Sequence, residues 1–65
     1  MTIDDSFEID GYTVLILSEE RPMTDWKALR IDGEEYAPQI VMDAGRNVIA
    51  VKGSHDLAGQ IVEFV

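Results

Sequence analysis

The sequence predicts an all-β domain: a small, strongly bent antiparallel meander of five or six short strands. Its apolar residues form short runs rich in Val, Ile and aromatic side chains, or alternate with polar residues, and both patterns are typical of strands. Turn signals separate these runs at the short spacing found in small sandwiches and barrels. The one competing interpretation is a helix that starts with residues 24–29. It would have to end before Asp32-Gly33, which leaves too few residues for a stable helix.

The chain length limits how this domain can be stabilised. The 65 residues suffice for one domain, which we expect to span residues 1–65. A chain of this size buries about 60% of the surface that its unfolded form exposes. The sequence contains no Cys, which excludes disulfides and thiolate zinc sites, while its apolar fraction of 46% is typical of a folded protein. Packing, alone or with self-association, must therefore stabilise the fold.

The strongest hairpin signal is Asp32-Gly33, which stands between two apolar arms. A tight primed turn requires positive φ, and Gly adopts positive φ without steric cost. We expect one arm to be a strand over residues 26–31 and the other to be a strand over residues 36–42. Because Pro38 cannot donate a ladder hydrogen bond, the second strand should lie at an edge or contain a bulge there.

The remaining strands are predicted on either side of this hairpin. Residues 7–9 and 12–17 are joined by a second Asp-Gly turn. The segment 12–17 is apolar on both faces, which favours a position in the interior of the sheet. Residues 48–51 and 61–65 provide two further strands, and we expect residues 1–5 to form a frayed tail.

A single helical turn is predicted over residues 54–58, with Ser54 as its N-cap and Gly59 as its C′ residue. In layout the chain resembles small SH3-like barrels, which also place a short helical turn before the final strand, although no family motif matches residue for residue. The resemblance implies a partial barrel, since closure removes exposed strand edges. The alternative is an open antiparallel sheet that covers its apolar face by dimerising.

The charge balance bears on the choice of partner. With 13 acidic and 5 basic residues, the formal net charge is −8. Such a surface repels phosphate, which argues against direct nucleic-acid binding and against docking on an anionic membrane. It favours a protein partner with a basic patch. An alternative function is an acidic nucleic-acid mimic that inhibits a DNA- or RNA-binding protein, because six acids and no base precede Arg21.

The sequence gives no targeting signal that we can identify. Its first residues lack the basic and apolar regions of a signal peptide. The longest strongly apolar run, residues 14–17, is too short to cross a bilayer. We therefore expect a cytoplasmic protein.

Residues with catalytic or metal-binding chemistry are few. The side chains of Ser54-His55-Asp56 are consecutive and so diverge, which favours turn and capping roles over a triad. Acidic clusters in segments 4–10 and 32–35 lack the spacing of an EF-hand, so a small metal-binding protein is an alternative without assigned ligands. The isolated glycines form no phosphate loop. We predict no enzymatic activity and no cofactor.

The predicted function is a protein–protein interaction module. Trp and Tyr are enriched at binding hot spots, and we select Met23, Trp26 and Tyr36 as candidate partner-binding residues, with Tyr12 as an alternative to Tyr36. The alternative for Trp26 is that it fills one end of the small core. The partner would be a protein with a basic patch, or a second copy bound through a strand edge near Pro38 or in the C-terminal strand.

Overall fold

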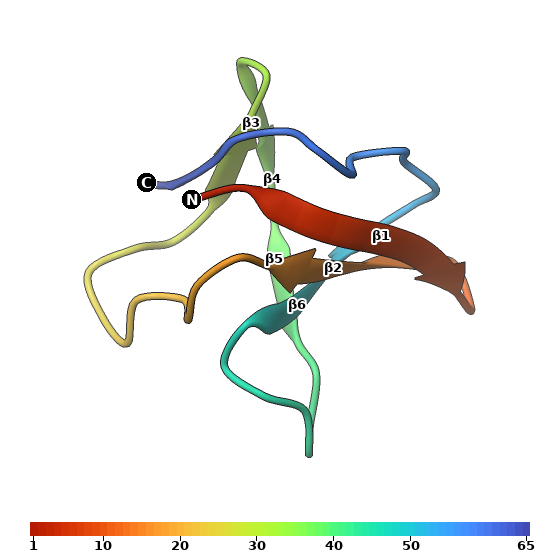
Figure 1. The fold of residues 1–65 in the computed structure, drawn as a ribbon, viewed down its shortest axis with the longest axis horizontal. Helices are drawn as coiled ribbons and strands as arrows, with labels where there is room; N and C mark the ends of the chain where they lie inside the picture. The colour runs from red at the N-terminus through yellow and green to blue at the C-terminus, as the bar shows by residue number, and fades with distance from the viewer.

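The computed structural model describes residues 1–65 and contains two antiparallel sheets and no helix (Figure 1). One sheet has the strand order β1-β2-β6-β5, and the other has the order β4-β3-β7. The predicted all-β class and bent antiparallel arrangement are confirmed. None of the chain forms a helix long and apolar enough to cross a membrane. The strands are β1 (Ile3–Ile9), β2 (Tyr12–Leu17), β3 (Leu29–Ile31), β4 (Glu34–Tyr36), β5 (Pro38–Ile40), β6 (Val48–Lys52) and β7 (Val62–Phe64).

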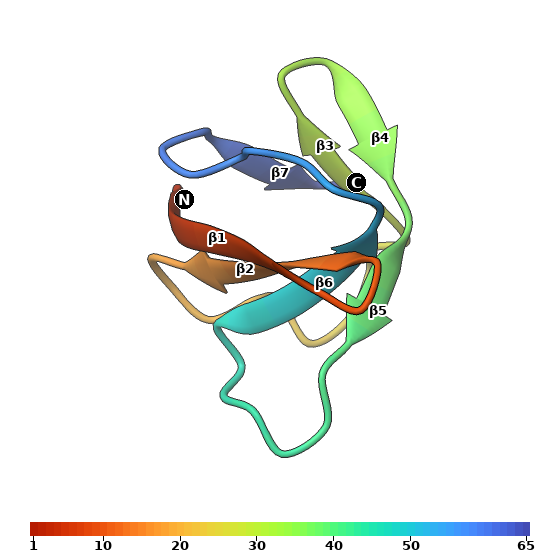
Figure 2. The ribbon, with the colours of Figure 1, turned by 90° about the vertical axis from the view of Figure 1, so that its right-hand side faces the viewer.

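The two sheets face each other and are joined at both sides (Figure 2). At one side the chain leaves β4 and enters β5 through Ala37, so it passes directly from one sheet to the other. At the other side Thr2 and Ile61 form an isolated bridge, and the Ile3 backbone N–H donates to the Gln60 carbonyl at 2.9 Å. The result is a bent meander that does not close into a complete barrel.

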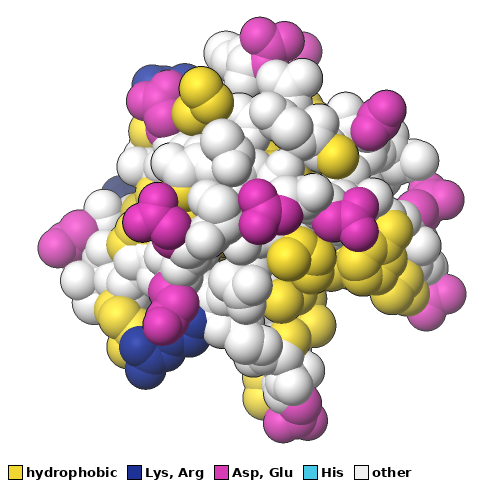
Figure 3. All heavy atoms as spheres, viewed as in Figure 1, with side chains coloured by type: hydrophobic (Ala, Val, Ile, Leu, Met, Phe, Trp, Pro, Cys, Tyr) yellow, Lys and Arg dark blue, Asp and Glu magenta, His cyan; other side chains and the backbone are white.

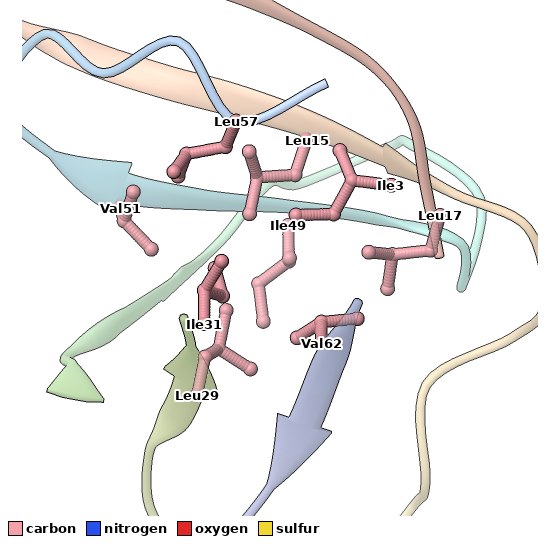
Figure 4. Close-up of a cluster of buried hydrophobic side chains, with 9 residues drawn as sticks. All are labelled: Ile3, Leu15, Leu17, Leu29, Ile31, Ile49, Val51, Leu57 and Val62. Carbon is pink, nitrogen blue, oxygen red and sulfur yellow. The ribbon is translucent and has the colours of Figure 1, made fainter. Parts of the chain in front are cut away.

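The core lies between the sheets and consists of nine buried apolar side chains (Figure 4). Alternate residues of β2, β3 and β6 point inward, as the two-residue period of a strand requires. Strands β1 and β7 and the connection between β6 and β7 supply the rest. Both sheets therefore depend on the same enclosed surface. The nine residues are Ile3, Leu15, Leu17, Leu29, Ile31, Ile49, Val51, Leu57 and Val62.

The prediction that residues 1–5 form a frayed tail is wrong. Strand β1 begins at Ile3, whose side chain is only 1% exposed and belongs to the core. The register shifts by a bulge between Ile3 and Asp5, after which β1 pairs regularly with β2. Burial of the Ile3 side chain and its backbone hydrogen bond to Gln60 stabilise this segment despite its polar neighbours. Both contacts are made with residues far away in the sequence, so local composition does not predict them.

The helical turn predicted over residues 54–58 is also wrong, because this segment is an irregular loop. Its backbone N–H groups are engaged by the sheet: His55 donates to Thr13 Oγ1 at 3.0 Å and Leu57 donates to Ser6 Oγ at 3.3 Å. Gly59 does have positive φ, but it lies in a β-turn closed by a hydrogen bond from the Gln60 N–H to the Leu57 carbonyl.

Two predicted strands have different bounds in the structure. The strand predicted over residues 26–31 begins only at Leu29, since the N–H groups of Lys27 and Ala28 share the Val65 carbonyl and so interrupt the regular ladder. The strand predicted over residues 36–42 is divided between the two sheets. Its second part, β5, lies at the edge of the four-stranded sheet, so the edge position predicted from Pro38 is confirmed.

The turn between β3 and β4 can be tested through its positive φ angles, which are 50° at Asp32 and 80° at Gly33. Gly33→Ala introduces no steric contact within 4 Å, so its cost comes from the left-handed backbone alone. We expect it to lower the free energy of unfolding by about 1–2 kcal/mol in urea denaturation. Asp32→Asn is the control and should change it by less than about 0.5 kcal/mol, because Asn tolerates this conformation. Equal stability of Gly33→Ala and the original chain would contradict the turn.

A second test concerns Thr13, the one buried polar side chain. Its hydroxyl donates to the Gly53 carbonyl at 2.6 Å and accepts from the His55 N–H. Thr13→Val leaves both backbone groups without that partner, and we expect a loss of about 1–3 kcal/mol in unfolding free energy. Hydrogen exchange at the His55 amide should accelerate in Thr13→Val and stay slow in Thr13→Ser, which keeps the hydroxyl. Unchanged exchange in Thr13→Val would refute the anchoring role.

Candidate functional site

The four-stranded sheet has a second face, opposite the core, that no other strand covers (Figure 2). Residues that alternate with the core positions point to this side. The register aligns them in rows: Phe7 lies opposite Val14, which lies opposite Ala50. We call this surface the outer face. Its residues are Asp5, Phe7 and Ile9 on β1, Tyr12, Val14 and Ile16 on β2, Val48, Ala50 and Lys52 on β6, and Gln39 on β5.

The outer face is mainly apolar. Phe7, Ile9 and Tyr12 are 44%, 51% and 38% exposed, whereas the small Val14 and Ala50 between larger neighbours are buried. An antiparallel sheet with one solvated face usually carries polar residues there. Figure 3 shows hydrophobic side chains gathered beside β1 and β2 on the surface. Contiguous exposed apolar residues of this kind mark interaction sites more often than isolated ones do.

Carboxylates line the β1 side of the outer face. Asp5 belongs to the face itself and Asp10 lies in the turn that follows β1, whereas Glu8 lies opposite Thr13 and so points to the core side of the sheet. Figure 3 shows acidic side chains along β1 next to the hydrophobic ones. Lys52, on β6, is the only basic residue of the outer face. The surface therefore combines an apolar centre with negative charge concentrated on one side.

The candidate residues Met23 and Trp26 do not belong to the strands of this face. Met23 is 71% exposed in the connection between β2 and β3. Trp26 is half-buried, and its ring packs edge-on against Phe64 at a centroid distance of 4.9 Å. Its Nε1–H donates to the Pro22 carbonyl at 2.7 Å. Trp26 thus packs against the core, which is the alternative that the sequence left open.

Tyr36, the third candidate residue, lies apart from Trp26. Its ring is half-buried and packs edge-on against His55 at a centroid distance of 5.1 Å. Tyr36 and Phe64 flank Leu29 from opposite sides of β3, so the two candidate rings pack on different sides of that strand. The structure does not assemble them into one surface.

The outer face was missed at the sequence level although its signal was present. Phe7 and Ile9 alternate with Glu8, which predicts a half-buried strand, and residues 12–17 are apolar on both faces, which predicts an interior strand. Strand β2 does lie between β1 and β6. Periodicity groups residues by face but does not show which face the second sheet covers.

One shallow hollow of about 400 Å³ lies between the β3–β4 turn and the connection leading into β7. Its lining is mostly polar or backbone and includes the carboxylates of Asp32 and Glu63. No group of three or more His, Asp or Glu side chains is placed to hold a metal ion. His55 lies elsewhere, with Nε2 3.0 Å from the Lys52 carbonyl. The hollow brings together no nucleophile and base.

Comparison with known proteins identifies no relative: no protein-family model matches the chain, and neither the curated proteins nor the solved structures give a match. The surface chemistry of the chain itself is therefore the basis for its proposed function.

Ionisation of Tyr36 provides a test of its surroundings. Burial, then the charge of Glu34, a 3.4 Å hydrogen bond from the Tyr36 hydroxyl to Glu34 and the charge of Asp32 raise the pKa of Tyr36 above its usual 10.0. As the pH rises, the unfolded chain therefore releases the Tyr36 hydroxyl proton at a lower pH than the folded chain does. The contribution of Tyr36 to stability is constant below pH 10.0 and decreases as the pH rises from there through the folded-state pKa.

Glu34→Gln should shift the pKa of Tyr36 toward its usual value, because the substitution removes a nearby negative charge. Ultraviolet titration of the phenolate measures this shift, with Tyr36→Phe identifying the signal. Urea denaturation at several alkaline pH values should show a steeper loss of stability in the original chain than in Tyr36→Phe. An identical phenolate titration in Glu34→Gln would contradict the assigned cause.

Proposed function

We propose that this protein is a small, acidic, non-catalytic interaction module of the cytoplasm and that the outer face is its binding surface. The observation that carries the proposal is the exposure of Phe7, Ile9 and Tyr12 on a sheet with no covering layer. Domains ordinarily bury the apolar face of a sheet against a second layer. A partner protein would supply that layer.

The charge distribution supports a partner with a basic patch. The chain has 13 acidic and 5 basic residues, and Asp5 and Asp10 border the apolar centre. Opposite charges across an interface accelerate association and select the partner. Burial of aromatic and aliphatic side chains at the centre would provide affinity. Affinity and selectivity thus come from adjacent parts of one surface.

The acidic nucleic-acid mimic is the weaker proposal. A protein that binds phosphate groups presents basic and polar side chains, which would match the carboxylates along β1. It would leave the apolar surface of Phe7 and Ile9 without a counterpart. The apolar centre therefore favours a general protein interface over imitation of a phosphate backbone.

The proposal is tested with the double variant Phe7→Thr/Ile9→Thr, since Thr keeps high β-propensity while removing most of the apolar surface. The immobilised protein is incubated with an extract of the cells that produce it, at low and at high salt. We expect proteins retained by the original chain to be lost from the double variant. Retention should weaken at high salt, because salt screens exposed charges.

Ile61→Thr is the matched control, because Ile61 is 66% exposed and belongs to the connection before β7 rather than to the outer face. It should retain the same proteins as the original chain. Circular dichroism and urea denaturation confirm that each variant is folded before the comparison. Equal retention by all three proteins, or no retained protein together with a monomer in sedimentation, would overturn the proposed function.

A further inference from the structure

We propose that the partner covers the outer face with an amphipathic helix whose apolar stripe contacts Phe7, Ile9 and Tyr12 and whose Lys or Arg side chains lie over β1. This inference rests on the proposed function and specifies the kind of partner. Its support comes from the size of the face, the condition of the sheet edges and the position of the charges.

The size of the outer face fits one helix, and the charge of the chain disfavours a second copy. Its exposed part spans β1, β2 and β6, roughly 10 Å across and 15 Å along the strands from ordinary strand spacing and rise. An α-helix with its side chains is about 10–12 Å wide. A second copy would bring another net charge of −8 against the face.

The sheet edges are poorly suited to an extended partner segment, which would bind by adding a strand. Strand β5 has three residues and starts with Pro38, which has no N–H to donate. Strand β4 also has three residues and carries Glu34 and Glu35. The start of β1 is already bonded, since Ile3 donates to Gln60 and accepts from the Gly59 N–H. At the start of the edge strand β7, the Val62 N–H already donates to the Met1 carbonyl. The sheet face is the more accessible surface, and helices pack readily on sheet faces.

The charges give the helix an orientation. Asp5 lies on the outer face of β1 and Asp10 in the turn after it, while Lys52 lies two strands away on β6. Basic side chains on only one side of the apolar stripe would face the carboxylates and avoid Lys52. A helix with this arrangement matches both the apolar and the charged parts of the surface.

The probe is a synthetic peptide of about 20 residues, long enough to form a helix. It carries Leu at helical spacing and Lys along one side of the Leu stripe. Isotope-labelled protein is titrated with it and followed by NMR. We expect shifts at outer-face residues and affinity at least about tenfold weaker for Phe7→Thr/Ile9→Thr, equivalent to about 1.4 kcal/mol. Ile61→Thr should bind as the original chain does.

Two further comparisons separate the periodicity from the charge. A peptide of equal composition with Leu at every second position presents a strand pattern and should bind at least about tenfold more weakly, since its apolar residues do not form a helical stripe. Replacing the two carboxylates beside the apolar centre, as Asp5→Asn/Asp10→Asn, should weaken binding of the Lys peptide and reduce its salt dependence, whereas Glu8→Gln, on the other side of the sheet, should change it less.

The inference is overturned if the strand-patterned peptide binds as well as the helical one, or if the shifts fall on β4, β5 or the hollow. Concentration-dependent shifts of the outer face without peptide would indicate a second copy and also overturn it. If the helical peptide fails while retention from the extract still requires Phe7 and Ile9, the helical partner is wrong and the interaction function stands. If retention also fails to depend on them, both proposals are wrong.

Discussion

The structure depends on the burial of nine apolar side chains between two sheets, neither of which could bury its own apolar side chains alone. Strands β3, β4 and β7 have three residues each, and a sheet of such strands has no independent stability without a packed face. Leu15 and Ile49, on the larger sheet, are fully buried and provide part of that packing. The chain has no Cys, so no covalent link replaces it. Enclosure of this core fixes the bend of the chain at Ala37 and the bridge between Thr2 and Ile61.

The same constraint creates the outer face. A chain of 65 residues supplies one four-stranded and one three-stranded sheet, and the smaller sheet covers only one side of the larger. The opposite side needs polar residues if it faces water permanently. Phe7, Ile9 and Tyr12 are exposed there instead, while the abundant carboxylates give the chain its net charge of −8. An uncovered apolar surface raises the free energy of the isolated protein, and burial of that surface would lower the free energy of a complex.

Local chemistry explains which features could be predicted from the sequence. Both Asp-Gly turns, the interior position of β2 and the edge position at Pro38 follow from backbone preferences and periodicity, and the structure has all of them. Features set by distant partners could not be predicted in this way. The loop before Gly59 is held by hydroxyl groups of Thr13 and Ser6 that lie about forty to fifty residues earlier in the chain. Of the candidate site, only its acidic character and one residue, Tyr12, were predicted, because the extent of the covering sheet is a tertiary property.

Negative charge and apolar exposure on one surface have a joint consequence. Two copies that approach through their outer faces each carry a net charge of −8, and like charges oppose association. A basic partner reverses the sign of that interaction while the apolar contact remains equally favourable. Under the proposed function, the carboxylates of Asp5 and Asp10 would therefore favour a basic partner over another acidic protein.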